Sequence, residues 1–363
     1  MDHYVIAELN MVGANIRKLS SDDFLGMRVS RVVLTGNRLG EGLVDYVFSS
    51  LGSHLTSLIL GACAIRALPP RLLVDLTQLK VLHLWNNHIG AIPNSFFVGS
   101  SELRELTLWS NRIHSVDNRT FYGLSHLRIL DLDNNRLSLL EHGALSHMSS
   151  TLKVLRLSSN HISALFDSTF SGLRQLRVLT LASNRLRFVD ARTFLGLHRL
   201  QTLSVADNRI QFVADGAFQD LEHLRTLDLS GNQMERVWAG TFVGLNSLMS
   251  VDLSRNRLAR LPEATFGQSP QLRQLNLEDN WLKTLVRCSL ASSTTIRSIS
   301  LIGNLIECDC RLAWISQLDT TTSTILGSCV VDKQHKSVLP VYQTSSYVDH
   351  RFCVHDAAHP CML

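Results

Sequence analysis

The amino-acid sequence predicts a solenoid of stacked coils of α/β class, with one short strand per coil and a parallel β-sheet along one face. The first observation is an eleven-residue phrase, L-R-E-L-T-L-W-S-N-R-I at 103–113, whose skeleton L-x-x-L-x-L-x-x-N-x-I recurs with a final Leu at 127–137 and 176–186. The second is a large apolar residue that recurs ten residues after the Asn of each phrase. Self-similarity at a fixed period near 24 residues is the signature of a repeat architecture.

Thirteen units can be counted from the Asn position of the phrase. Its successive occupants are separated by 23 to 26 residues: Ala14, Asn37, Cys63, Asn87, Asn111, Asn135, Asn160, Asn184, Asn208, Asn232, Asn256, Asn280 and Asn304. The apolar column is occupied by Phe24, Val47, Leu73, Phe97, Phe121, Leu145, Phe170, Phe194, Phe218, Phe242, Phe266 and Leu290. Two columns in one register exclude a chance match.

Each recurring feature of the repeat phrase has a physical role. In L-x-L the two leucines point inward and the residue between them points outward, as on a strand. After the strand the chain turns, and buried backbone N–H and C=O groups need partners. An Asn amide both donates and accepts, so a stack of Asn side chains can join each coil to the next.

Two units depart from the template. Two extra residues lie between Asn37 and Cys63, and one lies at 149–150, where surface bulges are expected. Cys63 stands in the Asn column, and we interpret it as a buried free cysteine rather than a reactive thiol.

Composition bounds the class of protein. The chain has 363 residues, 45% of them hydrophobic and 18% charged, which indicates a folded chain. The net charge is +4, and no Lys/Arg block indicates a nucleic-acid or membrane patch. No apolar run is long enough for a membrane span, and the first ten residues lack a signal-peptide stretch.

The first residues already fit the repeat template, with Ile6, Leu9 and Met11 in its apolar positions. We therefore expect a truncated N-terminus. The alternative is a cytosolic protein whose first unit is naturally bare.

The repeat phrase resembles that of the extracellular type of leucine-rich repeat proteins, over residues 4 to about 306. The resemblance implies a curved, horseshoe-shaped solenoid whose strands line the concave face. We accordingly expect a repeat domain over 1–306.

A cysteine-rich segment over 307–363 is expected to cap the last coil. It contains a C-x-C pair, a Trp and three later cysteines: Cys308, Cys310, Trp314, Cys329, Cys353 and Cys361. These residues resemble the disulfide-bonded C-terminal cap of extracellular leucine-rich repeat proteins. The resemblance implies the disulfides Cys308–Cys329 and Cys310–Cys353, with the Trp packed beneath the cap.

Alternatives for these cysteines remain. A zinc site would be the other use, but C-x-C with isolated later cysteines fits no common zinc spacing. Cys288 and Cys361 are left over, and their pairing is open. Disulfides indicate an oxidising compartment, so we expect a secreted or cell-surface protein. Asn118, in N-R-T, is an acceptor for N-glycosylation.

No catalytic chemistry is indicated. The sequence contains none of the common phosphate-binding, zinc-protease, serine-hydrolase or dinucleotide motifs, and its fifteen histidines are scattered. We expect no enzyme activity, no cofactor and no metal.

Binding is the better-supported class of function, on outward strand positions. Trp85 and Trp109 occupy the same slot in neighbouring units, so they should lie about 5 Å apart on an exposed face. Aromatic side chains are enriched at binding hot spots. The candidate ligand-binding residues are His83, Trp85, Thr107, Trp109, Asp131, Asp133 and Arg156.

The alternative for the two tryptophans is that they only pack on one another or beneath a missing N-terminal segment. Asp228 and Asp252 lie in L-D-L-S phrases that are common in such repeats, and we expect them to be solvated.

The expected function is a non-catalytic, extracellular recognition or adhesion module that binds a protein or glycan on its concave face. Nucleic acid is not expected, membrane contact is expected only through sequence outside this chain, and the oligomeric state is open. Caps of this kind resemble those of Slit-like, Toll-like and acid-labile-subunit-like proteins. One alternative is therefore the ectodomain of a Toll-like innate-immune or developmental receptor. Another is a structural or carrier subunit of the extracellular matrix or body fluid.

Overall fold

A computed structural model describes residues 6–167, 169–290, 295–308, 310–317, 323–332 and 337–341. Its contacts divide into two compact units, Met1–Arg185 and Leu186–Leu363. In both units each coil adds one short strand to a parallel sheet, so the predicted repeat solenoid is confirmed. The expected boundary between repeats and cap at 306/307 stays a prediction.

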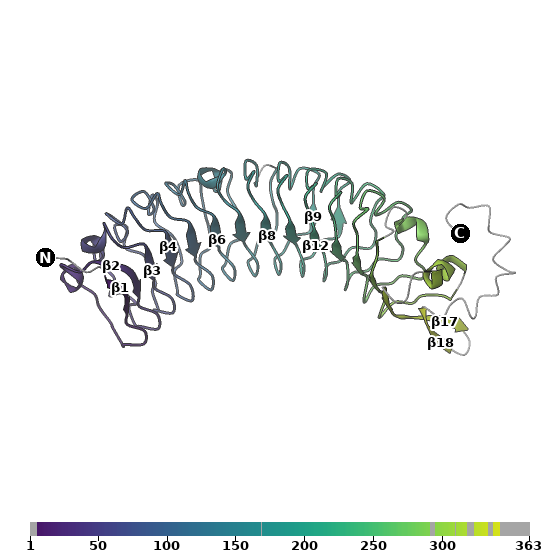
Figure 1. Ribbon diagram of the computed structural model, residues 1–363, viewed down its shortest axis with the longest axis horizontal. Coiled ribbons are helices and arrows are strands. Elements are labelled where there is room, and N and C mark those ends of the chain that lie inside the picture. The colour runs from purple at the N-terminus through teal and green to yellow at the C-terminus, as the bar shows by residue number, and fades with distance from the viewer. Residues whose placement is uncertain are drawn as a thin grey trace. The chain divides into compact units, whose positions relative to one another are not determined.

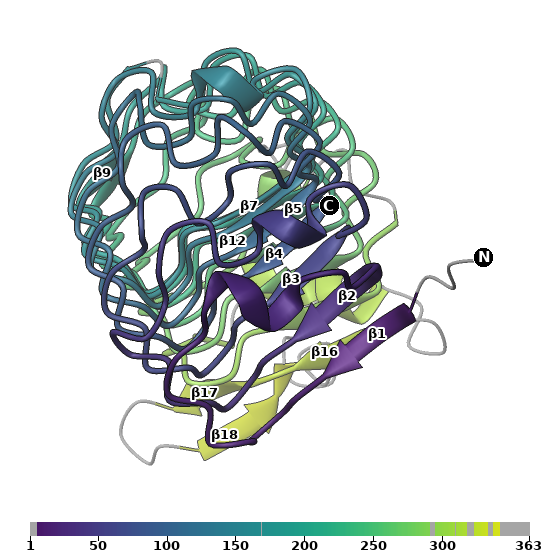
Figure 2. The ribbon, with the colours of Figure 1, turned by 90° about the vertical axis from the view of Figure 1, so that its left-hand side faces the viewer.

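The strands of the first unit lie side by side in chain order (Figure 1). They are β1 (Ile6–Asn10), β2 (Val29–Val33), β3 (Ser57–Ile59), β4 (Val81–His83), β5 (Glu105–Thr107), β6 (Ile129–Asp131), β7 (Val154–Arg156) and β8 (Val178–Thr180). Viewed along the coils, β1 to β5 lie on the same side of the winding chain (Figure 2). Short 3₁₀ helices interrupt the connecting segments: η1 (Ser21–Phe24), η2 (Ser49–Leu51) and η3 (Ser146–Met148).

The second unit continues the same plan. Its parallel sheet contains β10 (Thr202–Ser204), β12 (Thr226–Asp228), β13 (Ser250–Asp252), β14 (Gln274–Asn276), β15 (Ser298–Ser300) and β16 (Thr324–Leu326). Separate pairs are formed by β9 (Phe188–Val189) with β11 (Phe212–Val213), and by β17 (Ser328–Asp332) with β18 (Ser337–Pro340). The 3₁₀ helices are η4 (Arg287–Leu290) and η5 (Cys310–Gln317).

The sheet extends one strand beyond the predicted repeats. Ile299 of β15 pairs with Ile325 of β16, which lies in the cysteine-rich segment. The sequence around β16 lacks the L-x-L and Asn of the repeat phrase, so periodicity does not reveal this strand.

The core is made of the two predicted apolar columns. Inward leucines such as Leu82, Leu106 and Leu130 pair in register across neighbouring strands and are fully buried. Phenylalanines of the second column stack from coil to coil; the ring centroids of Phe218 and Phe242 are 6.2 Å apart. Each large apolar side chain buried in this way contributes about 1.5 to 3 kcal/mol.

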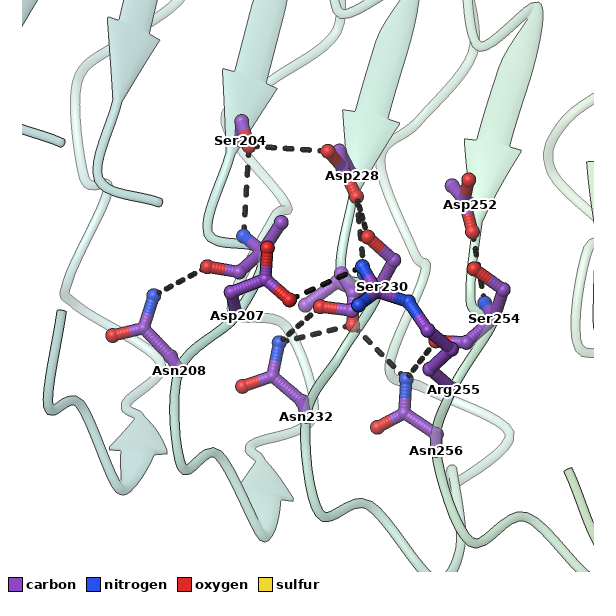
Figure 3. A network of polar contacts seen from close by, with 12 residues as sticks. Ser204, Asp207, Asn208, Asp228, Ser230, Asn232, Asp252, Ser254, Arg255 and Asn256 are labelled. Atoms are coloured by element: carbon purple, nitrogen blue, oxygen red, sulfur yellow. Dashed lines mark hydrogen bonds and ion pairs between the residues drawn. The ribbon is translucent and has the colours of Figure 1, made fainter. Parts of the chain in front are cut away.

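The Asn column joins each coil to the one before it. The Nδ2 of Asn256 donates to the carbonyl of Leu229 in the preceding coil at 3.0 Å. Its Oδ1 accepts the backbone N–H of Met234, also in the preceding coil, at 3.1 Å. Figure 3 shows Asn208, Asn232 and Asn256 in successive coils, each with its amide turned toward backbone carbonyls. The predicted role of the Asn stack is therefore confirmed.

The same pair of contacts to the preceding coil recurs along both units. It is made by Asn37, Asn87, Asn111, Asn135, Asn160, Asn184, Asn232, Asn256, Asn280 and Asn304.

Cys63 takes the place of one Asn and is a buried free thiol, as predicted. Its Sγ donates to the carbonyl of Leu34 in the preceding coil at 3.0 Å, as the amide does elsewhere. Burial raises the pKa of the Cys63 thiol. A buried, protonated thiol is a poor nucleophile, which favours a structural role.

The residue before each Asn position has a left-handed backbone. Such a conformation suits Gly, Asn and Asp, and it turns the chain away from the sheet. The residues and φ angles are Gly13 (63°), Gly36 (75°), Ala62 (53°), Asn86 (53°), Ser110 (56°), Asn134 (54°), Ser159 (56°), Ser183 (56°), Asp207 (50°), Gly231 (64°), Arg255 (54°), Asp279 (51°) and Gly303 (74°). Every strand therefore ends at the same point of its coil.

A disulfide joins Cys308 to Cys329, the first pair that the family resemblance implies. Trp314 is buried, as expected, and its indole N–H donates to the carbonyl of Leu285 at 2.9 Å. Cys288 is also disulfide-bonded. The expected pair Cys310–Cys353 and the cysteine Cys361 lie outside the described side chains.

We predict that Asn256→Ala lowers the free energy of unfolding by about 1 to 3 kcal/mol, because buried backbone groups lose their partners. Urea unfolding followed by circular dichroism measures the change. Asn246→Ala, at an exposed position in the same unit, is the matched control and should change stability by less than about 0.5 kcal/mol. Equal effects of the two substitutions would contradict the role of the Asn column.

Candidate functional site

The predicted ligand-binding residues come together on strands β4 to β7 of the first unit. Residues of one outward row are direct partners in the sheet: His83 pairs with Thr107, Thr107 with Asp131, and Asp131 with Arg156. A second row, immediately after the strands, holds Trp85, Trp109 and Asp133. Its coils are tied by backbone bonds, since the N–H of Asn86 donates to Trp109 and that of Ser110 donates to Asp133.

The two tryptophans form a stacked pair. Their ring centroids are 5.3 Å apart and their planes differ by 6°, in agreement with the spacing expected from the sequence. Trp85 is half-buried, and Trp109 is 38% exposed. Offset stacking of this kind contributes about 0.5 to 1.5 kcal/mol beyond area burial. One face of Trp109 is therefore covered by Trp85, and part of its surface remains open to a ligand.

Gly61 supports the pair from the other side. It occupies the same slot one coil before Trp85, and a Cβ placed on it would lie 2.4 Å from the indole Cε2 of Trp85. The ring lies flat on the Gly61 backbone because no side chain stands there. The sequence analysis did not single out Gly61, although the 24-residue period places it in the Trp column.

Glu105 is a further polar residue of the site that the sequence analysis missed. The Nε2 of His83 and the Oε1 of Glu105 are 3.0 Å apart, on neighbouring strands. Both side chains are half-buried. Glu105 lies one residue before the inward Leu106, so strand alternation turns Glu105 outward. That position was the signal available in the sequence.

Asp131 and Asp133 form a carboxylate pair. Asp131 is only 9% exposed, and its Oδ1 accepts the N–H of Asp133 at 3.0 Å. The Nη1 of Arg156 lies 3.6 Å from Asp131 Oδ2. Asp133 in turn accepts the backbone N–H of Ser158. The sequence analysis placed Asp131 among the outward candidates for ligand binding, and the structure shows that this outward residue is largely buried.

The environment raises the pKa of both carboxyls. For Asp131 the main cause is burial, opposed by the N–H of Asp133 and by Arg156. For Asp133, burial and then the negative charge of Asp131 raise the pKa to about 6, against the opposing effects of Ser158 and Arg156. The guanidinium of Arg156 thus opposes the rise in pKa of both desolvated carboxyls.

Thr107 lies between His83 and Asp131 in the outward row. It is 9% exposed, and its hydroxyl has no hydrogen-bond partner within the described residues. A buried hydroxyl without a partner costs about 1 to 3 kcal/mol, so Thr107 lowers the stability of this face.

Comparison with known proteins identifies the family. A sequence profile for leucine rich repeats matches residues 53–106, 101–151, 150–210, 198–258 and 246–306. The chain belongs to the leucine-rich repeat family. No curated protein sequence matches it.

Solved leucine-rich repeat structures share the fold. An internalin, InlF of Listeria monocytogenes strain 4b F2365, is 19% identical with a TM-score of 0.67, over 88% of this chain and 85% of the internalin. A chain of the octameric complex of latrophilin 3, Unc5D and FLRT2 is 21% identical with a TM-score of 0.67, over 90% of this chain and 91% of that chain.

The TLR13 complex with single-stranded RNA gives a TM-score of 0.50 and 21% identity, over 84% of this chain and 55% of the TLR13 chain. The present leucine-rich repeat chain thus spans about half the length of that neighbour. At these identities the likeness concerns the fold alone.

Outward acidic residues of the second unit are bonded into a ladder rather than simply solvated, contrary to the expectation for Asp228 and Asp252. Asp228 accepts hydrogen bonds from Ser204 on the preceding strand and from Ser230 (Figure 3). Asp252 accepts from Ser254 and from Asn276 on the next strand. These carboxylates already have partners within the leucine-rich repeat face.

A row of cations lies at the start of strands β4 to β8, although the sequence has no Lys/Arg block. Residues 24 or 25 positions apart in sequence become neighbours, and each backbone N–H donates to the carbonyl of the cation before it at 2.8 Å. The row consists of Lys80, Arg104, Arg128, Lys153 and Arg177. Among the described residues its one ion pair is between Arg104 and Glu102, at 3.9 Å. A search for runs of Lys and Arg along the sequence could not reveal this row, because its members lie in different repeats.

Within the described ranges, no group of three His, Cys, Asp or Glu side chains is arranged to hold a metal ion. Among the same residues, no helix has the length and apolarity needed to cross a bilayer. Asn118 is exposed, and Thr120 of its acceptor motif is buried. Glycosylation of Asn118 stays a prediction.

We predict that Asp133→Asn stabilises the protein at pH 7.5 by about 1 to 2 kcal/mol, allowing for partial exposure. The folded-state pKa of Asp133, about 6, lies above its ordinary 3.8, so the folded chain holds the proton more tightly than the unfolded chain. The free energy of unfolding therefore falls as the pH rises from about 4 to about 6.

Urea unfolding of both proteins between pH 4 and pH 7.5 tests this prediction. The variant's advantage should shrink to a small remainder near pH 4, where the carboxyl is protonated in the folded chain and about half protonated in the unfolded chain. An advantage that does not change with pH, or a variant less stable at pH 7.5, would show that Asp133 carries no such penalty.

Proposed function

We propose that this leucine-rich repeat chain is a non-catalytic extracellular recognition module that binds a protein through the outward face of β4 to β7. The main observation in support of this proposal is the stacked pair of Trp85 and Trp109. Aromatic side chains held rigid before binding lose little conformational entropy when a partner docks on them. Gly61 beneath Trp85 provides that rigidity.

Two further observations support the proposal. The family is an interaction scaffold, and one structural neighbour belongs to a complex of latrophilin 3, Unc5D and FLRT2. The disulfide Cys308–Cys329 supports an oxidising, extracellular location.

A screen of purified extracellular protein ectodomains against the immobilised chain tests the proposal. For any partner found, Trp109→Ser should weaken binding at least about tenfold, since hot-spot aromatics contribute 2 kcal/mol or more. Gly61→Ala should weaken it as well, because the new Cβ displaces the Trp85 ring without removing either indole.

Trp238→Ser is the matched control for this screen. Trp238 is 42% exposed, and it follows the Asn position of its coil rather than the strand. It should leave affinity unchanged. A partner that binds wild type and folded Trp109→Ser equally well would contradict the proposed face.

A second candidate function, binding of a sulfated polysaccharide, is favoured by the row of five cations from Lys80 to Arg177. Like charges on adjacent strands repel one another, so the row gains stability when a polyanion lies along it. The same positions of the second unit form no such row, because the uncharged Gln201 and Met249 alternate there with Arg225 and Arg273.

We predict that Arg104→Gln with Arg128→Gln elutes from heparin at lower salt than wild type. Arg225→Gln with Arg273→Gln, which removes two separated cations, should shift elution less. Equal shifts would show that total charge, and not the row, governs binding.

A parallel titration with single-stranded RNA belongs to the same experiment. The expectation that nucleic acid is not a ligand has no support, and one structural neighbour is a complex with single-stranded RNA. RNA bound more tightly than heparin at equal salt would replace the polysaccharide as the second candidate.

A further inference from the structure

The carboxylate pair beside the tryptophans lacks a full complement of positive charge. Asp131 and Asp133 share Arg156, whose guanidinium lies 3.6 Å from Asp131 and is itself 42% exposed. Glu105 adds a third carboxylate, paired with His83. Whether or not His83 is protonated, these carboxylates outnumber the cations that face them.

The open face of Trp109 lies toward the same carboxylates. Trp85 covers the face on the side of the preceding coil, so the other face is on the side of the coil that carries Asp133. The backbones of these two coils are joined directly, by the N–H of Ser110 and the carbonyl of Asp133 at 3.0 Å. An indole face and a carboxylate one coil apart suit a cation, which the ring attracts by about 0.5 to 2 kcal/mol.

A buried hydroxyl without a partner in the described part of the chain lies beneath the outward row. It belongs to Thr107, which is 9% exposed and lies between His83 and Asp131. The oxygen is covered by its neighbours, so the surface groups offered to a ligand are the indole of Trp109 and the two carboxylates.

We propose that Trp109, Asp131 and Asp133 bind the guanidinium of an arginine side chain presented by the protein partner. This inference rests on the function proposed above and names the chemistry of its ligand. A guanidinium is planar, so it can stack on the indole while its N–H groups donate to the two carboxylates. An ammonium group offers a point charge without the flat surface.

The pH dependence of binding follows from the same groups. Binding of a cation requires ionised Asp133, whose pKa of about 6 reflects burial and the charge of Asp131, with Arg156 opposing. His83 and Glu105, on β4 and β5, are two further titratable residues of the same outward face. Affinity for a guanidinium should therefore fall roughly tenfold from pH 7.5 to pH 5.

The test uses the full chain labelled with 5-fluorotryptophan and observed by ¹⁹F NMR. The chain has five tryptophans, and single Trp→Phe variants assign their signals. The probe is Nα-acetyl-arginine amide, and Nα-acetyl-citrulline amide is its uncharged isostere. The arginine amide should shift the Trp109 signal saturably and the Trp85 signal less, while citrulline amide shifts neither.

Internal and matched controls accompany the titration. The signals of Trp238 and Trp281 should not respond to the arginine amide. Asp133→Asn should abolish the Trp109 shift, whereas Asp228→Asn, in an outward row of the second unit, should leave it intact. Nα-acetyl-lysine amide should bind at least several-fold more weakly than the arginine amide.

Three results would overturn the inference: equal shifts with citrulline amide, an undiminished shift in folded Asp133→Asn, or lysine amide bound as tightly as arginine amide. The failures of the two proposals are distinguishable. If a partner depends on Trp109 but arginine amide does not shift its signal, the recognition face stands and the guanidinium ligand falls. If arginine amide binds but no partner depends on Trp109, the guanidinium site stands and the proposed recognition face falls.

Discussion

The hydrogen bonds of the Asn column are the constraint on which the rest of the structure depends. Each amide accepts an N–H from the preceding coil and donates to a carbonyl there, which fixes one coil against the next at a single register. The left-handed residue before each Asn turns the chain at the same point of every coil. Together they convert a period in the sequence into straight columns of side chains. Cys63 preserves the register with a weaker donor, because its thiol reaches the same carbonyl position.

The columns concentrate chemistry that the linear sequence keeps apart. Gly61, Trp85, Trp109 and Asp133 follow one another in a single slot, so a flat glycine backbone, two stacked rings and a carboxylate become neighbours. Asp131 and Asp133 lie two residues apart in one coil; burial raises the pKa of both, and the charge of Asp131 further raises the pKa of Asp133. The columns also align cations at the strand starts from Lys80 to Arg177. Repulsion between like charges lowers the stability of the unbound chain, and binding of an opposite charge relieves that repulsion.

The sequence predicts the scaffold well because the role of each scaffold residue depends on its position in the repeat. Leu106 and Asn111 belong to columns that recur through the units with few exceptions, so their roles follow from the period alone. The spacing of Trp85 and Trp109 follows from the same rule. The burial of Asp131 could not be predicted, because it depends on the sizes of neighbouring outward side chains. Glu105 was missed because its role depends on the one coil that places His83 beside it. The strand β16 was missed because it uses backbone pairing without the leucine and Asn phrase.

The central claim is that coil register holds Trp85 and Trp109 as one rigid stacked pair before any ligand arrives. Far-ultraviolet circular dichroism tests it most directly, because two indoles stacked at 5.3 Å couple their transitions. Wild type should show a bisignate indole signal that Trp85→Phe and Trp109→Phe each abolish, so that the single-variant differences do not add up to that of the double variant. Additive differences among folded variants would contradict the account, because they would show that the two rings do not interact in solution.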